Sequence, residues 1–195
     1  MNSTGARDKI CLMAETNPNA AIEAAKGIAD PWFRCQTLSC AARFINDRDR
    51  QNSVMDLAFA AANQTLEPNR IVTVSAWPLE VLCMHGNYER LATEIARLVH
   101  IIETEPHPVR RNDALLMVLQ NITAGPAESF NVVLEAFRNA CRAAHGGWKT
   151  DRNLRDAARL LANRADSQAA LELVNMITKP RARRQALRMI AQGDY

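Results

Sequence analysis

Regularly spaced arginines are the residues of this sequence best suited to contact an anionic partner. They form two triplets with the spacing i, i+3 and i+7: Arg152, Arg155 and Arg159, and Arg181, Arg184 and Arg188. On a helix, this spacing places the three guanidinium groups of a triplet on one face. A planar guanidinium binds carboxylates and phosphates through paired hydrogen bonds. We predict that the two helices lie side by side, about 10 Å apart, so that these residues form one six-arginine patch.

Charge is distributed unevenly along the chain. Of its 24 basic residues 20 are arginine, and the formal net charge is only +3, which excludes a histone-like protein or one with an acidic tail. Residues 1–137 carry 12 basic and 16 acidic side chains, whereas residues 138–195 carry 12 basic and 5 acidic ones. The six-arginine patch therefore predicts contact with an acidic protein surface or a nucleic-acid backbone. The alternative is a solvated helix face in a chain that uses arginine in place of lysine.

The usual signatures of catalysis and metal binding are absent from the sequence. It contains no glycine-rich phosphate loop, no CxxC, no HExxH and no GxSxG. Cys35 and Cys40 are not at a zinc-ligand spacing, and Cys11, Cys83 and Cys141 fall on apolar stripes. We expect all five to be buried, reduced thiols. We therefore predict a protein that is not an enzyme, with no catalytic residues, no cofactor and no metal.

Two of the three tryptophans stand where a helix is predicted to begin. For Trp32 and Trp148 we favour a structural role, in which the indole fills the gap between neighbouring helical units. The alternative is an exposed surface on which a ligand stacks. Trp148, beside Lys149 and Arg152, is the strongest candidate for such a surface, and we include it among the predicted binding residues.

An internal repeat organises the chain. Residues 20–42 and 169–191 align without a gap, and 9 of the 23 aligned residues are identical, where roughly two are expected by chance. In the first copy, Ile22, Ala25 and Ile28 form one apolar helical stripe. Asp30-Pro31 then turns the chain, because proline disfavours continuing a helix and suits the first turn of a new one. Each unit is thus two helices and a corner.

The corner recurs along the whole sequence. Pro31, Pro68, Pro106, Trp148 and Pro180 mark successive corners, at intervals of 32 to 42 residues. The corner at 145–148 uses glycine, which can end a helix in the left-handed conformation. Strand-like runs such as 71–74 lie within repeat units and are therefore predicted to be helical. We predict about eleven helices, no strand, and a kink or helix restart at Trp77-Pro78.

These corners carry a family resemblance. An acidic residue or Asp-Pro corner, an arginine two to four residues later and an Ala/Leu-rich second helix are similar to HEAT-like repeats, best seen over residues 107–116. The resemblance implies an all-α right-handed superhelix, or α-solenoid, of about five α-hairpin repeats of roughly 40 residues. It also implies one domain over residues 1–195, with the second helices lining the concave side.

The resemblance also suggests roles for individual residues. HEAT-like DNA glycosylases hold a damaged nucleotide against aromatic and acidic residues, and Trp148 with Asp151 is the one local cluster that resembles such a site. For the corner arginines we favour a structural ladder of ion pairs, such as Asp30 with Arg34. The corner arginines are Arg34, Arg70, Arg110 and Arg183.

We predict a protein–protein interaction module, or adaptor, that binds an acidic partner through its concave face and the six-arginine patch. The alternative is nucleic-acid binding through the same arginines. Self-association through the end segments 7–14 and 181–192 is a third possibility. The sequence has no signal peptide and no apolar run long enough to cross a membrane, so we expect a cytoplasmic protein without a membrane partner. Leaderless secretion into a host is left open.

Overall fold

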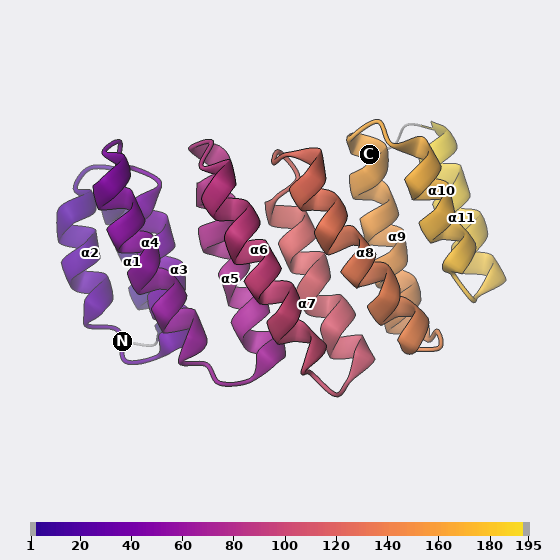
Figure 1. Cartoon of the computed structure of the whole chain (residues 1–195), viewed down its shortest axis with the longest axis horizontal. Coiled ribbons are helices and arrows are strands. Elements are labelled where there is room, and N and C mark those ends of the chain that lie inside the picture. Colours follow the sequence, from indigo (N-terminus) through magenta and orange to yellow (C-terminus); the bar gives the residue numbers. More distant parts are fainter. Residues whose placement is uncertain (1–2, 193–195) are drawn as a thin grey trace.

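In the computed structural model of the chain, residues 3–192 are described and fold into eleven α-helices joined by short turns (Figure 1). The helices are α1 (Ser3–Ala14), α2 (Pro18–Lys26), α3 (Pro31–Ala42), α4 (Arg48–Asn63), α5 (Pro68–Met84), α6 (Tyr88–Glu103), α7 (Pro108–Asn121), α8 (Ala127–Ala143), α9 (Trp148–Asn163), α10 (Ser167–Met176) and α11 (Pro180–Gln192). No strand occurs within these residues. The predicted all-α fold and its helix number are confirmed.

Local chemistry explains where the helices begin. Asn17, Asp30, Asp47 and Asp166 cap four helices, because each side chain accepts a backbone N–H from the first turn. Proline occupies the first turn of α2, α3, α5 and α7, where its missing N–H costs no intrahelical hydrogen bond. The corner before α9 has three residues with positive φ: His145 at 50°, Gly146 at 85° and Gly147 at 112°. The first left-handed residue after α8 is therefore His145 and not the predicted glycine, and the two glycines continue the turn.

The odd-numbered helices form one layer. From α1 to α11, each odd helix contacts the next odd helix along the chain. The even-numbered helices cover this layer: α2 and α4 pack on α3, α6 packs on α5, α8 on α7 and α10 on α9. Figure 1 shows the resulting row of helices, with α1 and α2 at one end and α10 and α11 at the other. One continuous apolar core runs between the helices, and its largest fully buried side chains include Phe130 and Phe137.

Two local predictions were tested by the helix bounds. The run 71–74 lies inside α5 and is helical, as predicted from its place in the repeat. The predicted helix restart at Trp77-Pro78 is wrong, because α5 continues through Pro78 to Met84. None of the helices within residues 3–192 is both long and apolar enough to span a lipid bilayer.

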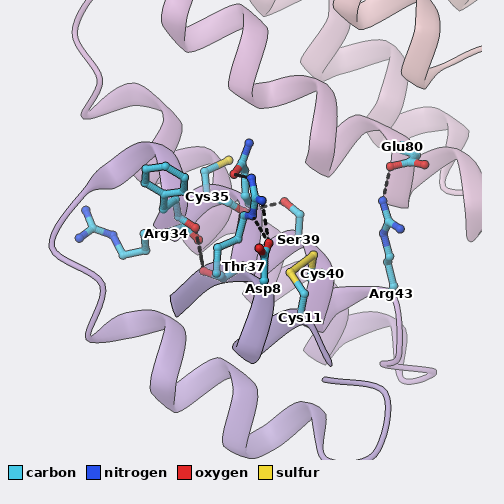
Figure 2. Close-up of a disulfide and its surroundings, with 12 residues drawn as sticks. Asp8, Cys11, Arg34, Cys35, Thr37, Ser39, Cys40, Arg43 and Glu80 are labelled. Carbon is cyan, nitrogen blue, oxygen red and sulfur yellow. Dashed lines mark hydrogen bonds and ion pairs between the residues drawn. A yellow bond between two sulfur atoms is a disulfide. The ribbon is translucent and has the colours of Figure 1, made fainter. Parts of the chain in front are cut away.

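The cysteines differ from the prediction of five thiols. Cys11 of α1 and Cys40 of α3 form a disulfide, with Cα atoms 5.3 Å apart (Figure 2). The prediction failed for this pair because spacing within one helix cannot reveal cysteines that packing brings together from 29 residues apart. Cys35, Cys83 and Cys141 are free and buried, as predicted.

Candidate functional site

In three of the odd helices, an arginine at the fourth position fixes the helix to the corner before it. Arg34 of α3, Arg111 of α7 and Arg183 of α11 each donate to the carbonyl oxygen six residues earlier. These carbonyls end the preceding segment and have no intrahelical partner, so the guanidinium satisfies a group that the helix leaves open. The three arginines therefore hold corners together and are not free for a ligand.

The predicted ladder of corner ion pairs is only partly present. The Asp30 carboxylate accepts from the backbone N–H of Trp32, whereas Arg34 donates to the carbonyl of Ile28, so the predicted Asp30–Arg34 pair is wrong. The cap forms because the Asp30 side chain reaches the first helical N–H groups without extending. Arg70 and Arg110 do approach one carboxylate, that of Glu67, at 3.9 and 3.8 Å.

Asp151 is the fourth residue of α9, and it binds a turn later in the sequence, whereas the three arginines bind an earlier one. It is 2% exposed and accepts from the backbone N–H of Thr178 at 2.9 Å, from that of Lys179 at 3.1 Å and from the Thr178 hydroxyl. These bonds join α9 to the turn before α11. Both carboxylate oxygens are occupied, so Asp151 and Trp148 do not form the open acidic and aromatic site that the glycosylase resemblance suggested.

Trp148 lies on the surface. It is 65% exposed, and the Arg152 guanidinium carbon lies 5.7 Å from the centre of its ring. The preferred expectation that Trp148 fills a gap between repeats is therefore wrong; Trp148 is the first residue of α9, directly after two glycines with positive φ, and its indole is exposed. Trp32 is partly buried and packs against the core, with Arg70 over its ring at 5.5 Å.

The two arginine triplets lie on neighbouring helices. α9 contacts α11, and Arg152, Arg159, Arg181, Arg184 and Arg188 are all exposed. Arg155 differs from the others, because it is half-buried and pairs with the adjacent Asp156 at 2.9 Å. The α11 triplet and Gln185 line a shallow hollow of about 450 Å³. The structure thus places the triplets on adjacent helices with five of the six guanidinium groups open to solvent.

Most arginines outside the six-arginine patch are held by a partner. Figure 2 shows one such pair, Arg43 of α3 with Glu80 of α5. Between residues 4 and 191, no hydrogen bond, ion pair or ring contact holds Arg159 or the α11 triplet. Arg48 of α4 shares this property, but it stands at the far end of the row. Unpartnered guanidinium groups are thus concentrated at the α11 end.

The sixth residue of each odd helix from α3 onward is polar, and we call this series the polar ladder. Its members are Gln36, Thr73, Asp113, Asn153 and Gln185. Thr73, Asp113 and Asn153 line a groove of about 400 Å³ between α5, α7 and α9, which we call the α5–α7–α9 groove. Arg110, Lys149 and Arg152 contribute positive charge to its lining.

A hydrogen-bonded network forms part of this groove. The Asn153 amide donates to Asn112 Oδ1 and to Asp113 Oδ1, both at 2.7 Å, and Lys149 pairs with Asp113. Asn153 is 0% exposed, and its Oδ1 has no hydrogen-bond partner among the described residues. Asn69 of α5 lines the same groove, and its buried Oδ1 is also without a partner. The groove therefore holds two buried acceptors that lack donors.

The free thiols are poorly suited to nucleophilic chemistry. Burial raises the pKa of Cys35 and of Cys141 to about 12. Burial and, second, the nearby Glu80 carboxylate raise the pKa of Cys83 to about 11. All three thiols are therefore protonated at neutral pH, whereas the thiolate is the reactive form.

Comparison of the chain with protein-family models, with curated proteins and with solved structures finds no match in any of the three. Within the described residues, no group of three or more His, Cys, Asp or Glu side chains is arranged to hold a metal ion. Sequence reasoning found the arginine triplets but missed the α5–α7–α9 groove. The available signal was the recurrence of a polar residue five positions after the start of each odd helix from α3 onward.

Proposed function

We propose that the chain is an α-solenoid of five hairpin repeats, from α1–α2 to α9–α10 with α11 as the end helix, that binds a partner protein and performs no catalysis itself. In this proposal, an acidic surface of the partner contacts the exposed face of the odd helices and the six-arginine patch. The series of contacts between successive odd helices supports a repeat stack. A stack of this kind presents a long surface whose exposed residues are free of packing constraints.

The unpartnered arginines carry this proposal. Arg159, Arg181, Arg184 and Arg188 are exposed and have no partner between residues 4 and 191, whereas arginines such as Arg43 are paired within the fold. A guanidinium without a partner in the fold is available to bind a carboxylate of another protein. Arginine is also enriched at protein interfaces.

Mixed charge on the same face favours a protein over a nucleic acid. Asp113 and Asp156 line the α5–α7–α9 groove beside the basic residues, so this face carries both signs of charge, whereas a nucleic-acid-binding face is predominantly basic. Met117 and Trp148 are exposed on α7 and α9 and offer apolar contact area. This combination of charge and apolar surface is typical of a protein interface.

The disulfide bears on where the protein acts. Disulfides persist in oxidising compartments and are rare in the cytosol. The Cys11–Cys40 bond therefore favours an oxidising compartment over the predicted cytoplasmic location. Within the proposal, the partner is met in an oxidising environment.

The test is an affinity capture with matched baits. Wild-type protein and a variant with all six patch arginines changed to glutamate are compared as baits, with nuclease added to both. The proposal expects a directly bound acidic protein that the charge-reversed bait loses. Retention of labelled duplex DNA at low salt, with the steep log–log salt dependence of phosphate contacts, would instead support nucleic-acid binding. Equal capture by both baits would refute a role for the patch.

A further inference from the structure

We infer that the hollow on α11 binds a tetrahedral oxyanion ester, a phosphate or a sulfate carried by a side chain of the partner protein. Arg181, Arg184, Gln185 and Arg188 line this hollow. The inference rests on the proposed function and deepens it, because it names the acidic group that the α11 arginines recognise.

The lining of this hollow is positive without an opposing charge. Its three guanidinium groups are exposed, no described residue pairs with them, and none of the described lining residues is acidic. In the α5–α7–α9 groove, by contrast, Asp113 and Asp156 offset the basic residues. In the hollow between α8 and α10, Arg138 pairs with Glu135 and Glu172. Of these three hollows, the one on α11 therefore attracts an anion most strongly.

The spacing of the α11 arginines lets all three contact one small ligand. Arg181 and Arg188 lie on one face of the helix, about 10 Å apart along its axis, with Arg184 between them. Their long side chains can lean toward a group bound at Arg184 from both sides. The Gln185 amide adds a further donor to the same lining.

The number of donors favours a tetrahedral oxyanion over a carboxylate. An ionised carboxyl group offers two oxygens and a single charge, whereas a phosphate monoester carries a charge of about −2 at pH 7 on three acceptor oxygens. A sulfate ester has the same shape and also presents three oxygens. Clusters of arginines recognise phosphorylated segments through such oxygens. Three guanidinium groups without a carboxylate match this group, whereas one carboxylate leaves most of their donors unused.

The internal repeat indicates that the helix itself does not require arginine at these positions. In the two aligned repeat copies, Arg184 corresponds to Cys35 and Arg188 to Ser39. Both α3 residues are fully buried, and the Cys35 thiol donates to a backbone carbonyl of α5. The same face of α11 is exposed, and α11 contains no acidic residue. Solubility of an exposed face is served by interspersed charges of both signs, so a face with arginines alone favours binding of an anion.

The experiment measures peptide binding by fluorescence anisotropy. Three labelled peptides carry one tyrosine among glycines: phosphorylated, sulfated, or unmodified and flanked by two glutamates, which match the charge of the phosphate. Wild-type protein is expected to bind the phosphate or the sulfate peptide about tenfold more tightly than the glutamate peptide, and the tighter of the two identifies the ester. Arg184→Lys keeps the charge but removes the planar fork, so this preference is expected to fall below about threefold. Arg48→Lys on α4, at an arginine that is also exposed, is the matched control and is expected to keep the preference.

The outcomes separate this inference from the proposed function. Equal affinity of wild-type protein for the three peptides would overturn the inference and leave charge-based binding intact. A preference that Arg184→Lys retains, or that Arg48→Lys loses equally, would also overturn it, because the preference would then not come from the α11 arginines. Labelled poly-L-glutamate is titrated in parallel. If it binds and none of the three peptides does, the inference alone fails; if it does not bind either, the proposed function fails as well.

Discussion

Asp151 is the joint between α9 and the last hairpin, so its removal is expected to release α11. Asp151→Ala leaves the backbone N–H groups of Thr178 and Lys179 without an acceptor. Each donor that loses a charged acceptor costs about 1 to 3 kcal/mol. Because the Thr178 hydroxyl can turn to water, we expect a total loss of about 3 kcal/mol in the free energy of unfolding.

The assay is urea denaturation followed by far-ultraviolet circular dichroism, combined with hydrogen exchange. Because Asp151 contacts the turn before α11, the variant is expected to speed hydrogen exchange of the α11 amides relative to wild type more than that of the α3 amides. The matched control is Asp156→Ala on the same helix, which removes a surface pair with Arg155 and is expected to cost less than about 1 kcal/mol. Equal costs for the two variants, or unchanged exchange in α11, would refute the assigned role of Asp151.

Three further predictions concern stability. Arg111→Ala is expected to lower the free energy of unfolding by about 1 to 3 kcal/mol, because the Glu105 carbonyl loses its donor. Arg110→Ala, at the half-exposed neighbouring residue, is expected to lower it by under about 0.5 kcal/mol in the same urea assay, and equal losses would contradict the corner role. Thiol titration of the denatured protein is expected to find three free cysteines before reduction and five after it, and five before reduction would refute the Cys11–Cys40 bond. Reduction is expected to lower the free energy of unfolding by about 3 to 4 kcal/mol, because it restores the loop entropy of a 29-residue separation to the unfolded chain. The free energy of unfolding is also expected to fall as pH rises from about 9 to 12, because unfolded thiols ionise near pH 9.0 while burial holds the pKa of Cys35 and Cys141 at about 12. A variant with the three free cysteines changed to alanine should show a shallower fall, and an identical pH profile would contradict this.

The fold was largely predictable because its determinants are local. Proline after a capping residue, as at Asp30-Pro31, and one apolar stripe in each helix are readable from neighbouring residues, and they predicted the helices. At Pro78 the sequence left a kink and a helix restart open, because an interior proline gives the same signal for both, and only the restart is wrong.

The candidate site was less predictable because it depends on packing between distant helices. The spacing of Arg181, Arg184 and Arg188 fixed their common face, but which arginines lack partners depends on contacts across the layer. Asp151 looked like an exposed neighbour of Trp148, yet the turn at Thr178 covers it from 27 residues away. The Cys11–Cys40 pair and the α5–α7–α9 groove also join elements that are far apart in sequence.

The affinity of the protein for labelled poly-L-glutamate tests the central claim most directly. The triple variant Arg181→Glu, Arg184→Glu and Arg188→Glu is compared with a control that reverses three arginines outside the patch, Arg48, Arg50 and Arg142, so that both change the net charge equally. At about 0.5 kcal/mol for each lost contact and a similar cost for each repulsion, the patch variant is expected to bind at least tenfold more weakly than wild type, and the control less than threefold. Equal losses in the two variants, or no binding by wild-type protein, would contradict a located acidic-partner site on α9 and α11.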